Sequence, residues 1–322
     1  MFKTALLLSA LAISSNALPA PASSLQARSI GPKIASIVNV LGNFTIDNPP
    51  PFAADYVSNN SQTGTMSDYD LSRYATYAGA AYKVNSTSWT CHLNCEQACT
   101  EGTVVDLHWS VRTPASTGFI AHNPSSKEIF VVYRGSYTLE DWLEDFTFIQ
   151  VPSPILVPGS LMHTGFLTAY RANHRQVKDT LEKLLAMYPD YTLIVTGHSL
   201  GGGEAAVAAT DFAIAKPAWI PRMKLITFGQ PRVGNIVHAK WLSQQKFPIF
   251  RVVNRGDPVP HVPTIAMNYY HEAQQVWYDL SGKVNFCGRD GDSSTCSDSV
   301  PLSKWSWNQH NEYPGLYFEP LH

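Results

Sequence analysis

Residues 191–209 read YTLIVTGHSLGGGEAAVAA, the most informative segment of the chain. Residues 191–196 form an apolar, partly β-branched run typical of a buried strand, and the alanine-rich run that follows is typical of a helix. Between them lies a G-x-S-x-G motif centred on Ser199. A serine on so tight a turn is held in a strained backbone conformation, close to the free amides of the helix N-terminus. We therefore predict a nucleophilic Ser199; the alternative is a turn in which Ser199 only caps the helix.

Length and composition indicate a folded globular protein. The chain has 322 residues, of which 44% are hydrophobic and 15% charged. This length suits one large domain or two ordinary ones. The net charge of −2 gives no reason to expect a nucleic-acid partner.

The N-terminus is typical of a secretory leader. Lys3 precedes an apolar stretch over residues 5–13, and Ser15-Asn16-Ala17 fits a small-x-small cleavage site. The stretch is too short to span a bilayer. We predict that the protein is secreted and extracellular, with a signal peptide over residues 1–17. Residues 18–28 are rich in Pro, Ala and Ser, which would suit a short propeptide, and residues 29–322 would then form the mature domain.

The secretory route predicts disulfides and modified asparagines. Cys287 and Cys296 flank a polar loop and are expected to pair with each other in an oxidising compartment. Glycosylation sequons begin at Asn43, Asn59 and Asn85.

Three more cysteines, Cys91, Cys95 and Cys99, lie close together. One pair can form and one thiol remains, with Cys91–Cys95 favoured and Cys91–Cys99 close behind. A zinc site is not expected, because no second Cys/His cluster lies at ligand spacing.

The order of apolar segments predicts an α/β fold with a mainly parallel sheet. Strand-like runs alternate with turns and with helical patterns. Functional side chains in such folds lie at the carboxyl ends of the strands, where Ser136, Ser199 and Asp257 fall. The expected strands cover residues 118–122, 129–133, 191–196, 225–228 and 249–254, and the expected helices cover 67–83 and 162–188.

A nucleophilic serine needs an imidazole base and a carboxylate that orients the base. Asp257 is the best carboxylate, because it follows a strand and its loop, DPVPHVP, is stiffened by prolines. An ordinary Asp-Pro turn is the alternative. Asp211 lies on the expected helix after Ser199, and Asp279 stands beside Ser281-Gly282 in a sequence typical of a turn.

Three histidines after Asp257 are candidates for the base. The chain order serine, acid, histidine leaves His261, His271 and His310. His310 is favoured, because it lies in a polar stretch near the C-terminus that can fold back over the strand ends. His271 opens an expected strand, and His261 is too close to Asp257 to reach both partners easily.

The stretch after the second expected strand suggests an oxyanion hole and a lid. The backbone amides of Leu200 and Ser136 are the expected donors to a developing oxyanion. Residues 138–146 then form one apolar and one acidic helical face. Such a helix could cover an apolar cleft in water and open transiently at a neutral lipid surface, or it could simply pack on the core. The apolar face consists of Leu139, Trp142, Leu143 and Phe146.

Taken together, these motifs resemble the secreted filamentous-fungal lipases of class 3. The resemblance rests on YRGS, on HTGF at 163–166, on TGHSLGG at 196–202 and on TFGQPRVGN at 227–235, followed by a late Asp and His. It implies an α/β-hydrolase variant in one domain, with Ser199, Asp257 and His310 as the catalytic triad. It further implies Ser136 and Leu200 as the oxyanion hole, a lid near 138–146 and no cofactor.

The chain departs from the family pattern in two respects. Lys83 follows the early helix and no cysteine lies near His322, so the disulfide that joins this helix to the C-terminus in many members is expected to be absent. Gly203-Glu204 follows the elbow where Ala and an apolar residue are expected, and the sequence suggests no role for Glu204.

The resemblance implies hydrolysis of triacylglycerol esters at an oil–water interface, without an obligate protein partner. Within the family, a feruloyl-type esterase and a phospholipase A1 remain alternatives, although the apolar stripe with Trp142 favours the lipase. Outside it, a serine peptidase or a lipid-binding module on the same scaffold remains open. A binding module would not need the three triad residues together.

Overall fold

The computed structural model describes residues 65–83, 100–113, 115–136, 148–152, 158–288, 291–314 and 316–318. Their centre is an eight-stranded sheet in the order β1-β2-β3-β6-β7-β8-β9-β10. Strands β3, β6, β7, β8 and β9 run parallel to one another, and the pairs β1–β2, β2–β3 and β9–β10 are antiparallel. The strands are β1 (Val104–Arg112), β2 (Ala115–Asn123), β3 (Glu128–Tyr133), β6 (Thr192–His198), β7 (Met223–Phe228), β8 (Ile249–Asn254), β9 (Gln275–Tyr278) and β10 (Val284–Cys287).

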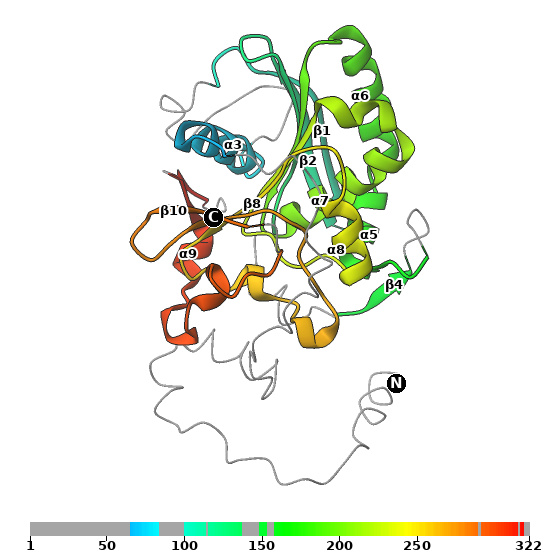
Figure 1. Cartoon of the computed structure of the whole chain (residues 1–322). Helices are drawn as coiled ribbons and strands as arrows, with labels where there is room; N and C mark the ends of the chain where they lie inside the picture. The colour runs from blue at the N-terminus through cyan, green and yellow to red at the C-terminus, as the bar shows by residue number, and fades with distance from the viewer. Residues whose placement is uncertain are drawn as a thin grey trace.

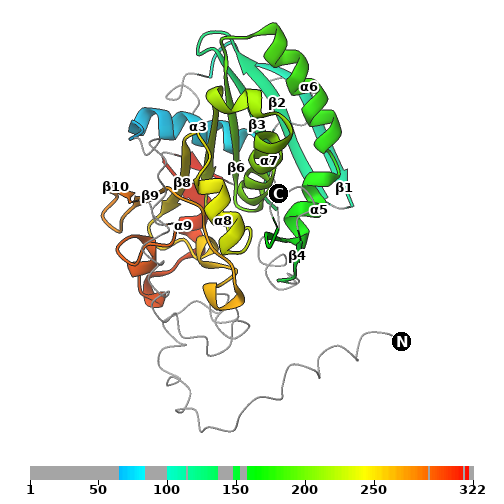
Figure 2. The same ribbon diagram turned by 45° about the vertical axis from the view of Figure 1, so that its right-hand side comes forward.

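Helices cover both faces of this sheet (Figures 1 and 2). Helix α7 (Leu200–Ala215) packs on β3, β6 and β7, and α5 (Thr164–Arg171) packs against α7. Helix α3 (Asp68–Ala80) packs on the same three strands from the opposite side.

Two-stranded sheets pair β4 (Gln150–Pro152) with β5 (Leu161–His163) and β11 (Glu312–Tyr313) with β12 (Leu316–Tyr317). The α-helices are α3 (Asp68–Ala80), α5 (Thr164–Arg171), α6 (His174–Met187), α7 (Leu200–Ala215), α8 (Ile236–Ser243) and α9 (Trp307–Asn311); the 3₁₀ turns are Pro217–Arg222, Val259–His261, Ile265–Met267, Ser297–Ser299 and Leu302–Lys304.

The two-sided burial explains why the central strands read as continuous apolar runs. In β3, Ile129 and Val131 belong to the hydrophobic cluster beneath α5, α6 and α7, whereas Phe130 and Val132 belong to the cluster beneath α3. Alternate side chains of a strand point to opposite faces, so a strand covered on both sides needs apolar residues at every position. The α/β-hydrolase prediction for the fold is confirmed by this architecture together with the solved structures compared below.

The expected long helix over residues 162–188 was wrong. Met162 and His163 end strand β5, and two helices, α5 and α6, follow with a break between them. The break lies at Asn173, whose side chain is buried and donates to Ser116 Oγ at 2.6 Å and to the Ala169 carbonyl at 3.4 Å. Asn173 is the N-cap residue of α6, but its side chain bonds Ser116 and Ala169 instead of the first amides of that helix, and the apolar periodicity did not reveal this break.

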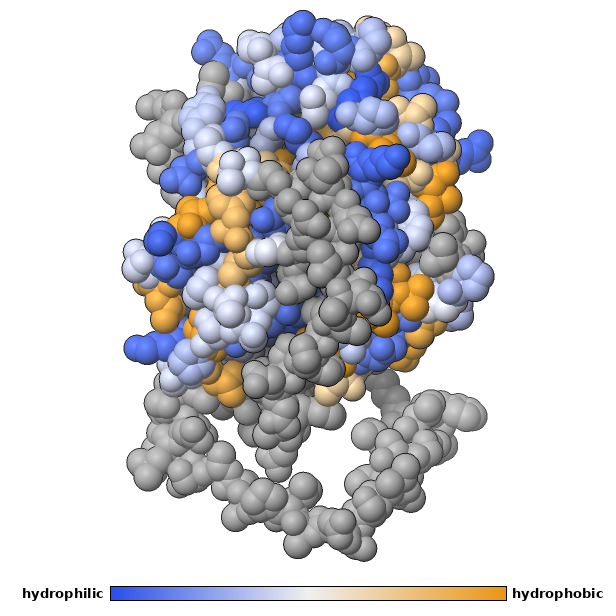
Figure 3. Space-filling view, in the orientation of Figure 1, coloured by the Kyte–Doolittle hydropathy of each residue, from blue (hydrophilic) through white to orange (hydrophobic). Residues whose placement is uncertain are grey.

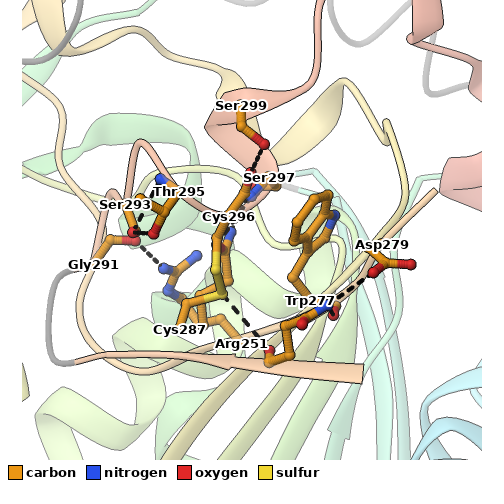
Figure 4. Close-up of a disulfide and its surroundings, with 12 residues drawn as sticks. Arg251, Trp277, Asp279, Cys287, Gly291, Ser293, Thr295, Cys296, Ser297 and Ser299 are labelled. Atoms are coloured by element: carbon orange, nitrogen blue, oxygen red, sulfur yellow. Dashed lines mark hydrogen bonds between the residues drawn. A yellow bond between two sulfur atoms is a disulfide. The ribbon is translucent and has the colours of Figure 1, made fainter. Parts of the chain in front are cut away.

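The predicted Cys287–Cys296 disulfide is formed, with 6.1 Å between the Cα atoms. Figure 4 shows the loop that it closes, with Arg251 of β8 reaching toward it. The Arg251 guanidinium donates to the Gly291 carbonyl and, at 2.7 Å, to the carbonyl of Glu272. The disulfide and this buried arginine together hold the loop in contact with the sheet. Cys91, Cys95 and Cys99 lie outside the described residues.

The face of the molecule seen in Figure 3 is mostly hydrophilic or intermediate in hydropathy, and its hydrophobic residues form small separate groups. No helix in the described ranges is long and apolar enough to cross a membrane.

Candidate active site

Ser199 lies at the turn between β6 and α7, with φ of 59° and ψ of −130°. A positive φ is strained for a residue other than glycine. The elbow is tight because the glycines two residues to either side allow close contact: a Cβ on Gly197 would lie 2.3 Å from the Gly201 carbonyl oxygen, and one on Gly201 would lie 2.1 Å from that of Tyr133. The Ser199 amide donates to the Phe228 carbonyl at 2.8 Å, which ties the elbow to the end of β7.

Asp257 and His310 are brought together at the carboxyl ends of the strands. Both are almost completely buried. His310 Nδ1 lies 2.9 and 2.8 Å from the two carboxylate oxygens of Asp257. The carboxylate also accepts from the Val259 amide at 2.9 Å and from the Tyr313 hydroxyl at 2.5 Å. A carboxylate so fully engaged holds the imidazole in one orientation and favours a proton on Nδ1.

The two atoms between which a proton would pass are both unpaired. Among the described residues, neither Ser199 Oγ nor His310 Nε2 has a hydrogen-bond partner, and both atoms are buried. The side chain of His198, the residue before Ser199, connects the elbow to the His310 backbone. Its Nε2 lies 2.8 Å from the His310 carbonyl oxygen. Buried polar groups are rarely left without partners, and such groups cluster at functional sites.

The other two candidate histidines have structural partners. His271 is buried, and its Nε2 lies 2.7 Å from the Pro260 carbonyl oxygen. Burial and two nearby arginines, Arg251 and Arg232, hold its pKa well below the ordinary value. His261 pairs with Asp298 at 2.9 Å and stacks on Trp305. The two alternative carboxylates are also engaged elsewhere: Asp211 pairs with Lys178 at 2.7 Å, and Asp279 accepts from amides in the β9–β10 turn.

Arg232 braces the loop that carries Asp257. Its guanidinium donates to the carbonyls of His261 and Pro263 at 2.6 and 3.0 Å. The same group pairs with Asp292, a residue of the disulfide-closed loop, at 2.8 and 2.9 Å. Asp292 and Arg232 therefore connect the disulfide-closed loop to the segment that follows Asp257. The sequence contained no signal for this connection.

The two predicted oxyanion residues each adjoin a residue of the elbow or one close to it. Ser136 is half-buried and follows Gly135, where a Cβ would lie 3.0 Å from the Cβ of Ser199. Leu200 is the first residue of α7, and the first amides of a helix have no partner within it. The predicted lid over 138–146, with Leu139, Trp142, Leu143 and Phe146, lies outside the described residues. So do Asn43, Asn59 and Asn85 and residues 1–28.

Glu204 follows the elbow and is fully buried on α7. Its Oε2 accepts from Ser116 Oγ at 2.7 Å, and its Oε1 has no partner among the described residues. Burial raises the pKa of this carboxyl from 4.5 to about 8, against smaller opposing effects of Ser116 and Arg134. Glu204 is therefore a neutral acid in the folded protein at neutral pH, directed toward β2 and not toward Ser199.

This buried acid predicts a pH-dependent stability. Between pH 4.5 and about 8 the folded carboxyl keeps a proton that the unfolded chain releases, so stability present below pH 4.5 is lost as pH rises to about 8. The loss is on the order of 5 kcal/mol. Urea unfolding at pH 5 and pH 8 should show a much smaller loss for Glu204→Gln than for the wild type. Glu182→Gln, at an exposed carboxylate, is the control; an equal loss in all three proteins would contradict the assignment.

Among the described residues, no group of three or more His, Cys, Asp or Glu could hold a metal ion. The arrangement itself suits acyl transfer: a strained serine, a histidine held by a buried carboxylate, and amides at a helix N-terminus. Fold and site together define an α/β-hydrolase-type protein with a strained serine at the β6–α7 turn and a buried His–Asp pair.

Comparison with known proteins narrows this class to one family. The profile described as "Lipase (class 3)" matches residues 130–267. Secreted mono- and diacylglycerol lipase A of Penicillium cyclopium is 34% identical over 243 residues, covering 70% of this chain and 78% of that protein. This chain belongs to the class 3 lipase family, as its motifs suggested.

Solved structures agree with this assignment. That of Rhizomucor miehei triacylglyceride lipase has a TM-score of 0.72 at 32% identity, covering 78% of this chain and 95% of that chain. Lipase II from Rhizopus niveus has a TM-score of 0.74 at 27% identity, covering 79% and 96%. The sequence match to the Rhizomucor miehei lipase spans 64% of that protein's full length.

Proposed function

We propose that this protein is a secreted lipase that hydrolyses carboxylic esters of acylglycerols through an acyl-enzyme on Ser199. The observation that carries the proposal is that His310 Nδ1 bonds the Asp257 carboxylate, while His310 Nε2 and Ser199 Oγ are both buried without a partner among the described residues. One solved relative, 33% identical with a TM-score of 0.72, is described as a triacylglycerol lipase whose catalytic centre is a serine protease triad.

In the proposed mechanism each group has a defined role. His310 Nε2 takes the proton of Ser199 as Oγ attacks the ester carbonyl, while Asp257 stabilises the resulting imidazolium. The amides of Ser136 and Leu200 donate to the oxyanion. His310 then returns the proton to the departing alcohol, leaving an acyl-enzyme. Water, deprotonated by the same histidine, attacks the acyl-enzyme and regenerates Ser199.

Secretion and glycosylation at Asn43, Asn59 and Asn85 belong to the same proposal. Relatives from Penicillium and Fusarium are named as secreted lipases, and the leader-like residues 1–17 agree with export. The apolar stripe of 138–146 is proposed as a lid that makes transient contact with lipid surfaces. No obligate protein partner is proposed.

The substrate class is tested by comparing four esters across their solubility limits: a long-chain triacylglycerol, the matching diacylglycerol, phosphatidylcholine and methyl ferulate. We expect the acylglycerol rates to rise steeply when monomers give way to an emulsion, because a lid that opens at a lipid surface exposes the site only there. Trp142→Ser should weaken that rise without changing turnover of a short soluble ester. A flat response with faster turnover of methyl ferulate would indicate a feruloyl-type esterase, and preference for phosphatidylcholine would indicate a phospholipase A1.

A further inference from the structure

His198 stands beside the nucleophile, and the proposed mechanism does not use it. It is 2% exposed and lies at the last position of β6. Its Nε2 is 2.8 Å from the His310 carbonyl oxygen, and its Nδ1 is 2.8 Å from the hydroxyl of Tyr82. A buried histidine with both nitrogens engaged has a defined tautomer.

The partners determine where the protons lie. A carbonyl oxygen can only accept, so His198 Nε2 carries a hydrogen and donates to His310. Burial, together with the nearby His310, holds the pKa of His198 well below its ordinary value, so the ring is neutral and Nδ1 is an acceptor. The Tyr82 hydroxyl must then donate to Nδ1. The result is a directed chain from Tyr82 through His198 to the backbone of His310.

This chain joins three separate parts of the fold. Tyr82 follows α3, His198 ends β6, and His310 lies in the five-residue helix α9. The last carbonyls of a helix have no partner within it, so in a helix this short donors from outside help to hold the backbone. The His198 N–H, from the residue adjoining Ser199, bonds the His310 carbonyl, while Asn254 Nδ2 donates to the carbonyls of Gln309 and Glu312.

Ring packing supports the same arrangement. The His198 ring lies 4.5 Å from the ring of His310 and 4.2 Å from that of Phe318, measured between centroids. The Tyr82 hydroxyl lies 2.2 Å from where a Cβ on Gly135 would stand, next to Ser136. Tyr82 therefore contacts the proposed oxyanion loop as well as His198.

We propose that Tyr82 and His198 are positioning residues that align His310 with Ser199: Tyr82 locks the His198 tautomer, and the His198 N–H holds the His310 backbone. The neutral His198 ring also adds no positive charge next to the imidazolium that forms on His310. This inference rests on the proposed function, because it assumes that His310 is the base.

The test uses isosteric variants and a short soluble p-nitrophenyl ester. Tyr82→Phe removes the hydroxyl that donates to His198 Nδ1. The His198 proton can then move to Nδ1, which would leave the Nε2 lone pair facing the His310 carbonyl oxygen. His198→Leu removes the donor to His310, and His198→Gln restores an N–H near the same position. Tyr77→Phe is the matched control, because Tyr77 is a buried tyrosine of α3 whose hydroxyl bonds Thr103 at 2.8 Å, away from the site.

We expect kcat to fall about ten- to hundredfold in Tyr82→Phe and His198→Leu, with KM changed less than twofold, since small misplacements of a catalytic group have effects of this size. His198→Gln should recover most of kcat, and Tyr77→Phe should retain it. Full activity of both Tyr82→Phe and His198→Leu, or no recovery in His198→Gln, would overturn the proposal. If instead the wild type hydrolysed no ester, or Ser199→Ala remained fully active, the proposed function itself would fail.

Discussion

Ester hydrolysis by Ser199→Ala is expected to fall by about 10⁴-fold or more. The acyl-enzyme cannot form without Oγ, and the remaining donors supply only binding and oxyanion stabilisation. Activity on a short soluble ester and on an emulsified triacylglycerol should fall together, because both substrates need the same nucleophile.

The same variant should be at least as stable as the wild type. Ser199 Oγ is buried without a partner among the described residues, so its removal takes away an uncompensated polar group and no hydrogen bond. Alanine also keeps a Cβ at the positive φ, so the backbone strain is unchanged. A thermal midpoint equal to or above that of the wild type serves as the control for folding. Near-normal turnover would refute Ser199 as the nucleophile.

Asp257→Asn is expected to lower kcat by about 10³- to 10⁴-fold. The asparagine amide would donate to His310 Nδ1 and place the imidazole proton on Nε2, where the lone pair is needed to take the proton of Ser199. Geometry would change little, because the remaining amide oxygen can still accept from Tyr313 or the Val259 amide. The measurement is kcat for a soluble ester over a range of pH.

Asp279→Asn is the matched control, because Asp279 also accepts backbone amides but lies in the exposed β9–β10 turn. Tyr313→Phe should give an intermediate loss, since it removes one of the hydrogen bonds that hold the Asp257 carboxylate. Equal activities of Asp257→Asn and Asp279→Asn would show that another carboxylate orients the base.

The elbow and the acid candidate were predictable because their signals are local. G-x-S-x-G between a strand and a helix needs glycines at both flanks for steric reasons, and Gly197 and Gly201 show that close contact. The histidine that acts as the base was harder to predict from the sequence. His261, His271 and His310 all follow Asp257 and all are buried, so it is their hydrogen-bond partners, which spacing does not encode, that separate them.

Long-range contacts explain what the sequence did not reveal. Tyr82 and His198 are 116 residues apart, and nothing in the local pattern of Tyr82 marks it as different from the tyrosines of α3, which precedes it. The break at Asn173 depends on Ser116, and the burial of Glu204 depends on the same serine. Strand β1 was not expected, because at the sheet edge its exposed and half-buried positions carry polar residues that weaken the apolar pattern.

The most direct test of the central claim is covalent labelling with an alkyl p-nitrophenyl phosphonate. An activated serine oxygen attacks phosphorus, p-nitrophenolate leaves, and a stable phosphonyl ester remains on the enzyme. If Ser199 is the nucleophile, we expect one equivalent of p-nitrophenolate per chain, with the added mass on the peptide that contains Ser199, and much slower release from His310→Ala. A label on another residue, or equal release from Ser199→Ala, would contradict it.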